Sequence, residues 1–131
     1  MISRNEKFLQ QLNSVIESHI SDKTFGVKSL SQSLQMSEVT LWRKVRKLTS
    51  LTPNEYLQKF RLQQAGLMLA DDAGSVSEIA AAVGFSNNSY FTKCFREQFG
   101  VVPSLCRSRQ STNKKDHKVL AFPDWKIYED N

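Results

Sequence analysis

Basic side chains have the most evident chemistry in this 131-residue sequence, and six of the 18 Lys and Arg residues lie in two short segments. The segments cover residues 43–47 and 93–96, and their cations are Arg43, Lys44, Arg46, Lys47, Lys93 and Arg96. Guanidinium and ammonium groups bind phosphate oxygens, and they also donate to the O6 and N7 acceptors of guanine. The two segments therefore favour a polyanionic partner.

The net charge agrees with this interpretation. The formal charge is +5 and the isoelectric point is near 9.4. Residues 1–110 carry 14 Lys or Arg against 9 Asp or Glu, whereas residues 111–131 carry 4 of each sign. A basic globular part favours a polyanion, although a solvated charged surface explains the same excess equally well.

The remaining residues offer little catalytic chemistry. His19 and His117 stand outside any motif, and Cys94 and Cys106 lack a further ligand at metal-binding spacing. We interpret the cysteines as buried reduced thiols, and we expect no enzyme, no cofactor and no metal site. Because no apolar run approaches the roughly 20 residues of a membrane span, we expect a cytoplasmic protein without membrane contact.

The elements that must position the basic side chains are helices. Apolar residues recur at helical spacing, and Thr52 with Glu55 and Ser75 with Glu78 form predicted capping boxes. Gly84 is a natural helix stop. The predicted fold is all-α, with about seven helices and no strands, near residues 4–20, 27–34, 38–49, 52–70, 75–83, 87–99 and 102–107.

The helix over residues 52–70 separates two segments that resemble each other. The segment near residues 30–37 aligns with residues 79–86 at an offset of 49, and residues 41–46 align with residues 91–96 at an offset of 50. Each copy reads as a short helix, a tight turn and a longer basic helix, which is the outline of a helix-turn-helix. At about 1.5 Å per residue, the helix between them would span about 27 Å.

These residues resemble the DNA-binding domains of AraC/XylS-type transcription regulators over roughly residues 8–107. The most specific part is EIAAAVGFSNNSYFTKCFREQFGVVPS, and the first copy adds Leu41-x-Arg43-Lys44. The segments FLQQLNSVIESHISD, FGVKSLSQSL and YFTKCF are similar to output domains of two-component and hybrid sensor regulators. The resemblance implies one domain over residues 1–110, with helix-turn-helix units at 26–49 and 75–100 joined by the linker helix at 52–70.

By this resemblance, we expect sequence-specific binding of double-stranded DNA by a bacterial transcription regulator that acts as an activator. Two recognition helices would enter successive major grooves. RNA polymerase and fused sensor or receiver domains are expected partners, with this chain as the C-terminal part of a regulator or a minimal version of one. The alternative is a helical protein-interaction module that binds an acidic partner.

In the first unit, helical spacing places Leu41, Val45 and Leu48 toward the core. The resemblance places DNA base contacts on the other side, at Val39, Trp42 and Arg43. Arg43 is expected to read guanine, and the two apolar side chains to press on thymine methyl groups. A partly buried Trp42 is the alternative. Ser50 replaces the glycine that usually ends this helix.

In the second unit, Phe91, Cys94 and Phe95 face the core. The expected DNA base contacts are Asn87, Asn88, Ser89, Thr92 and Lys93. Asn88 suits the donor and acceptor edge of adenine, and Lys93 suits guanine. Helix capping is the competing assignment for Asn87.

The expected DNA phosphate contacts are Lys44, Arg46, Lys47 and Arg96. Arg61 either braces the domain or lies free on the surface. Residues 111–131 are polar, then mixed apolar and acidic, and we expect a flexible C-terminal tail. Docking of residues 119–128 on the domain or on a partner is the alternative.

Overall fold

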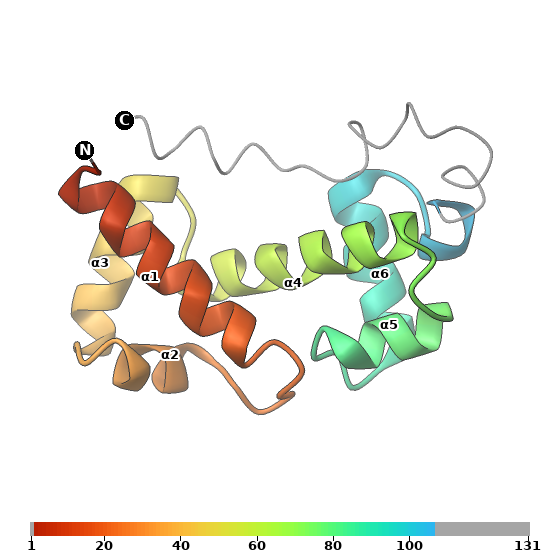
Figure 1. Ribbon diagram of the computed structural model, residues 1–131, viewed down its shortest axis with the longest axis horizontal. Helices are drawn as coiled ribbons and strands as arrows, with labels where there is room; N and C mark the ends of the chain where they lie inside the picture. The colour runs from red at the N-terminus through yellow and green to blue at the C-terminus, as the bar shows by residue number, and fades with distance from the viewer. Residues whose placement is uncertain (1, 107–131) are drawn as a thin grey trace. The chain divides into compact units, whose positions relative to one another are not determined.

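The computed structural model describes residues 2–106, and this part of the chain is all-helical (Figure 1). Its six bounded helices are α1 (Arg4–Ser18), α2 (Val27–Ser33), α3 (Glu38–Thr49), α4 (Pro53–Ala70), α5 (Val76–Ala82) and α6 (Asn88–Phe99). A further helical turn occupies residues 103–106. Residues 2–106 contain no strand, so the predicted all-α fold is confirmed. The predicted tail over residues 111–131 lies outside the described residues.

Side-chain caps begin the helices where the sequence predicts them. Ser75 and Glu78 form a reciprocal capping box at the start of α5. At the start of α4, the Thr52 N–H donates to Glu55 Oε1 at 2.9 Å, and the Glu55 N–H donates to Thr52 Oγ1 at 3.2 Å. The hydrogen bonds that Glu55 shares with the backbone and side chain of Thr52 lower the pKa of this carboxyl group. The local sequence therefore determines these boundaries.

The described chain divides into two compact units, and the first comprises residues 2–20 and Thr24–Phe60. In this unit α1 packs on α2, and α2 packs on α3. The Tyr56 hydroxyl on α4 donates to the Asn13 side chain on α1. The core of the unit is formed by Phe8, Leu9, Leu12, Ile16, Phe25, Leu30, Leu41, Val45, Leu48, Tyr56, Leu57 and Phe60.

The second unit comprises Ser21–Lys23 and, within the described chain, residues 61–106. Its core contains a row of aromatic rings on and before α6. The ring centroids of Phe85 and Phe91 lie 5.1 Å apart, and those of Phe91 and Phe95 lie 5.7 Å apart. Cys94 and Cys106 are both buried and reduced, as predicted.

Arg61 on α4 is a buried brace of the second unit, which decides between the two interpretations of this residue. It is only 7% exposed, and its Nη1 donates to the Val83 carbonyl oxygen at 2.8 Å. Its Nη2 donates to the Asp22 carbonyl oxygen at 3.2 Å. Burial lowers the pKa of the guanidinium, and the charge of Asp22 opposes this change.

Helix α4 contributes to both units along one continuous run of 18 residues. Its residues up to Phe60 belong to the first unit and its residues from Arg61 onward to the second. Tyr56, Phe60, Leu62 and Leu69 are buried, whereas Leu67 is 38% exposed and lies on the solvent side of the helix.

Candidate nucleic-acid interface

The predicted repeat is present as two helix-turn-helix units (Figure 1) whose corresponding helices are equal in length. Helices α2 and α5 each have 7 residues, and α3 and α6 each have 12. The short helices end in the same hydrogen bonds: Met36 N–H donates to the Ser31 carbonyl at 3.0 Å, and Phe85 N–H donates to the Ala80 carbonyl at 2.9 Å. Both turns are therefore Schellman motifs.

The two units use different residues for the same backbone geometry. The turn between the helices has a positive φ at Gln35 in the first unit and at Gly84 in the second. The longer helices end in left-handed conformation at Ser50, with φ 64°, and at Gly100, with φ 80°. Ser50 thus keeps the geometry that usually requires glycine, at a cost in backbone strain.

Helix α3 presents the predicted contact residues to solvent. Leu41, Val45 and Leu48 are buried on one side, as expected. Val39 is 65% exposed and Trp42 is 49% exposed, and Arg43 is exposed as well. Trp42 is therefore a surface residue rather than part of the core. Two large apolar side chains beside a guanidinium could contact thymine methyl groups and guanine.

Two of the predicted phosphate contacts in α3 have partners within the first unit. Lys44 Nζ lies 5.1 Å from the centroid of the Phe8 ring, within the range of a cation–π interaction. Arg46 Nη1 donates to the Ser50 carbonyl oxygen at 2.7 Å and so caps the end of its own helix. Both side chains, together with Lys47, are exposed. The spacing of these residues did not predict the two internal contacts.

Helix α6 also divides into a buried and an exposed side. Phe91, Cys94 and Phe95 are buried, as predicted. The predicted base contacts are exposed except Thr92, which is half-buried: Asn87, Asn88, Ser89, Thr92 and Lys93. Asn88, Ser89 and Lys93 thus lie on the solvent side of α6, with Asn87 at its N-cap and Thr92 partly covered.

Two asparagines at the start of α6 have defined roles. Asn87 is the N-cap, and its side chain accepts the Tyr90 N–H at 2.9 Å. The capping assignment for Asn87 is therefore confirmed, and the cap uses one acceptor position of its amide oxygen. Asn88 Nδ2 donates to Ser77 Oγ on α5 at 3.0 Å.

A hollow of about 450 Å³ runs along the exposed side of α6. It brings together three predicted base contacts, Ser89, Thr92 and Lys93, and the predicted phosphate contact Arg96. Glu97 and Val102 also line it. Its two cations and two hydroxyl groups suit an anion, whereas Glu97 adds an opposing charge that the sequence prediction did not include.

Tyr90 is an exposed aromatic residue that the sequence prediction did not assign to the interface. Its side chain is 51% exposed, and its ring centroid lies 6.1 Å from that of Phe85. It lies in the first turn of α6, the helix that carries the predicted base contacts. Its position in α6 and its amphipathic ring could have singled it out from the sequence.

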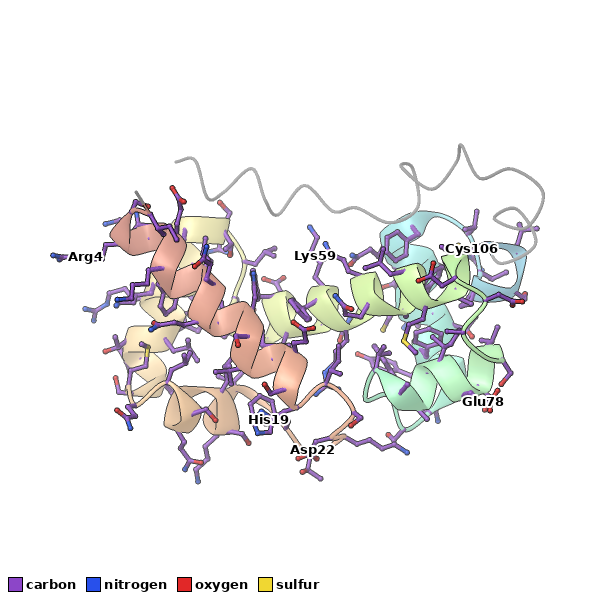
Figure 2. The ribbon with its side chains drawn as sticks, viewed as in Figure 1. Arg4, His19, Asp22, Lys59, Glu78 and Cys106 are labelled. Carbon is purple, nitrogen blue, oxygen red and sulfur yellow. The ribbon has the colours of Figure 1, made fainter. Side chains whose placement is uncertain are left out.

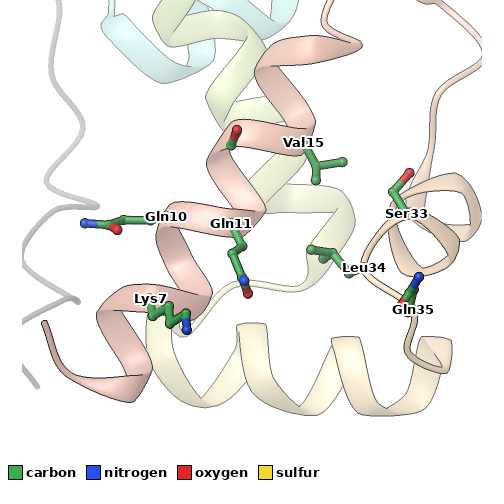
Figure 3. A pocket seen from close by; sticks show the side chains of 8 residues that line it. Lys7, Gln10, Gln11, Val15, Ser33, Leu34 and Gln35 are labelled. Atoms are coloured by element: carbon green, nitrogen blue, oxygen red, sulfur yellow. The ribbon is translucent and has the colours of Figure 1, made fainter.

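A second hollow, of about 680 Å³, lies in the first unit between α1 and the end of α2 (Figure 3). Its lining residues are Lys7, Gln10, Gln11, Ser14, Val15, Ser33, Leu34 and Gln35. None of the predicted contact residues borders it.

His19, labelled in Figure 2, has partners within the first unit. Its ring stacks on that of Phe25 with centroids 4.4 Å apart, and its Nδ1–H donates to the Val15 carbonyl at 3.0 Å.

The described residues hold no group of three or more potential metal ligands. No helix among them combines the length and apolar character needed to cross a membrane.

The residue pattern of a family described as a helix-turn-helix domain matches residues 30–109 of this sequence. The chain belongs to the AraC-type helix-turn-helix family. It is 35% identical over 109 residues to histidine kinase P4 from Formosa agariphila, covering 83% of this chain and 8% of the kinase. It is 32% identical over 101 residues to the transcriptional activator RhaS from Salmonella paratyphi B, covering 77% of this chain and 36% of RhaS.

A solved structure of the DNA-binding domain of AdpA, the global transcriptional factor, in complex with a target DNA, has the same AraC-type fold. Its sequence identity is 28% and its TM-score is 0.72, over 82% of this chain and 96% of that chain. The present chain spans well under half the length of the two curated relatives, histidine kinase P4 and RhaS. The matches confirm the predicted family, which is one of DNA-binding domains.

Proposed function

We propose that this AraC-type domain binds double-stranded DNA in a sequence-specific manner, with α3 and α6 as its two recognition helices. The observation that carries the proposal is the duplication. Two helix-turn-helix units of equal helix lengths each present a basic second helix whose predicted contact residues lie on the solvent side. A single helical hairpin with basic residues would be weaker support, because such hairpins serve many purposes.

In this proposal, Arg43 and Lys93 donate to guanine, Val39 and Trp42 contact thymine methyl groups, and Asn88 reads adenine. Ser89 and Thr92 are further base contacts, and Asn87 acts mainly as the cap of α6. The phosphate contacts are Lys44, Arg46, Lys47 and Arg96. Lys44 and Arg46 are already held by Phe8 and Ser50, so part of their ordering precedes binding.

The binding experiment is selection of bound sequences from a random duplex pool. We expect two short boxes whose centres lie about one helical turn apart. Arg43→Ala should relax sequence preference in one box only, and Lys93→Ala should relax it in the other, each by about 1–3 kcal/mol at the affected position. Equal relaxation in both boxes would contradict the assignment of separate reading helices.

Salt dependence distinguishes this proposal from a protein-interaction module with an acidic partner. If about five phosphates are neutralised, log affinity should fall with log salt at a slope of roughly −4 to −5. Binding that is insensitive to salt, or that shows no preference among duplex sequences, would favour the protein-interaction module.

We also propose the biological setting from the relatives. RhaS is named a transcriptional activator, and histidine kinase P4 is far longer than the segment that matches it. The domain is accordingly proposed to be a cytoplasmic output domain that acts behind a sensor or receiver domain and activates transcription by contacting RNA polymerase. Transcription in vitro from a promoter that carries both boxes, with and without the protein, tests the activating role.

The proposed domain boundary lies near residue 110. A chain truncated after residue 110 should then keep the affinity and unfolding temperature of the full chain. A large loss in either quantity would place residues 111–131 within the functional domain.

A further inference from the structure

The Asn88 side chain connects the two helices of the second helix-turn-helix unit on their solvent side. Its Nδ2 donates to Ser77 Oγ at 3.0 Å, and both residues are exposed. Asn88 is the first residue of α6, and Ser77 lies in the first turn of α5. The N-terminal part of a recognition helix is the part that reaches base edges.

The backbone at both ends of this hydrogen bond is fixed by other contacts. In α5, the Ser75 N–H donates to Glu78 Oε1 at 2.8 Å, and the Glu78 N–H donates to Ser75 Oγ at 3.1 Å. In α6, the Asn87 cap fixes the first turn. The Ser77–Asn88 hydrogen bond is therefore not needed to begin either helix, and its main effect is on the orientation of the Asn88 amide.

That orientation matters for reading DNA. An asparagine amide has one acceptor oxygen and two N–H donors, and adenine recognition uses the oxygen together with one N–H. Ser77 takes one N–H and leaves Oδ1 and the second N–H available. Without a fixed partner, the terminal torsion of asparagine is broad, and the amide can present a donor or an acceptor to several bases.

We propose that Ser77 is a positioning residue for base readout, which turns the Asn88 amide so that Oδ1 and the remaining N–H meet an adenine. The inference rests on the proposed function and adds a residue that acts through another rather than by touching DNA. It applies to the second unit only, because the aligned positions of the first unit hold Lys28 and Glu38. A lysine only donates and an ionised glutamate only accepts, so this pair cannot reproduce the amide edge.

The test compares three single variants and one double variant of the full 131-residue chain with wild type. Asn88→Ala first identifies the base position at which adenine preference is lost. Affinity is then measured for four duplexes that differ only at this position. We expect Ser77→Ala to lower adenine preference there about 3- to 10-fold, since it removes one hydrogen bond to the amide. Ser77→Thr keeps the hydroxyl group and should keep the preference.

Two further readouts separate positioning from a structural role. Ser77→Ala should leave the box read by α3 and the salt slope unchanged, and should unfold at the wild-type temperature. The double variant Ser77→Ala with Asn88→Ala should behave as Asn88→Ala alone, because the two residues act as one unit.

The inference is overturned if Ser77→Ala keeps the wild-type preference, or if it weakens all four duplexes equally. It is also overturned if Asn88→Ala changes no base position. Failure of the proposed function looks different, because the wild-type chain itself would then show no sequence-dependent duplex binding.

Discussion

At the scale of single residues, the two helix-turn-helix units differ where the backbone is most constrained. Ser50 and Gly100 end α3 and α6 in the same left-handed conformation. Glycine adopts this conformation without a steric penalty, whereas a residue with a Cβ atom pays about 1–2 kcal/mol. The Arg46 hydrogen bond to the Ser50 carbonyl helps to hold the strained turn.

We therefore expect Ser50→Gly to raise the free energy of unfolding by about 0.5–1 kcal/mol, since relief of strain exceeds the extra backbone freedom of glycine in the unfolded chain. Gly100→Ser is the matched reverse substitution. A Cβ atom at Gly100 would meet no heavy atom within 4 Å, so its cost of about 1 kcal/mol should come from backbone conformation alone. Chemical denaturation of both variants measures the two effects. An unchanged or lower stability of Ser50→Gly would contradict the strain at this turn.

Arg61 is the residue whose loss should affect stability most directly. It supplies two charged hydrogen bonds to backbone carbonyl groups, and one of these groups, at Val83, belongs to the end of α5. We expect Arg61→Met to lower the free energy of unfolding by about 2–3 kcal/mol, because the carbonyl groups lose a charged donor within a buried site. Arg43→Met is the control, since Arg43 is exposed and its replacement should stay within about 0.5 kcal/mol of wild type. If thermal unfolding shows the same loss of stability for both substitutions, the hydrogen bonds of Arg61 do not stabilise the second unit.

At the scale of elements, α3 and α6 are equal in length but different in surface chemistry. Helix α3 presents the apolar side chains of Val39 and Trp42 beside Arg43, whereas α6 presents an amide, hydroxyl groups and a lysine beside Tyr90. Apolar side chains distinguish bases mainly through the C5 methyl group of thymine, and polar side chains do so through hydrogen bonds. The two helices should therefore read their boxes by different means.

Replacement of thymine by uracil tests this difference. In the box read by α3, we expect each contacted methyl group to contribute about 0.8 kcal/mol, or roughly fourfold in affinity. The same replacement in the box read by α6 should have a smaller effect. Trp42→Ala and Val39→Ala should each reduce the loss of affinity that follows from replacing thymine by uracil. Fluorescence anisotropy measures these affinities. A wild-type chain that binds uracil and thymine duplexes equally would show that α3 does not contact the methyl groups.

At the scale of the whole molecule, the proposal depends on α4, because this one continuous helix belongs to both units. A helix is far stiffer than a loop, and its 18 residues extend about 27 Å at 1.5 Å per residue. Successive major grooves recur about 34 Å apart. We therefore predict that the chain tolerates little variation in box spacing, and that binding bends the DNA at a cost of order 1–6 kcal/mol.

Insertion of five base pairs between the boxes moves them by about half a helical turn. We expect this insertion to lower affinity more than about tenfold, toward the affinity of a duplex with one box. Gel mobility of circularly permuted duplexes measures the bend. Equal affinity across all spacers would indicate that the two units bind as flexibly joined modules.

The sequence by itself determined the order and ends of the helices, the duplication and the division of α3 and α6 into buried and exposed sides. These features follow from local signals: capping boxes, proline and glycine positions, and apolar spacing. The contact residues were chosen partly by resemblance, and their contact with DNA stays a prediction.

The tertiary structure decided what depends on residues far apart in sequence or on the surroundings of a side chain. Arg61 is buried, and its side chain donates to the carbonyl groups of Val83 and Asp22. Lys44 lies over the ring of Phe8, and Trp42 and Leu67 are exposed. The tertiary structure also joins Asn88 to Ser77 across the tight turn. A periodic pattern shows which side of a helix is apolar. It cannot show which polar atom meets which, because this depends on the packing of one helix against another.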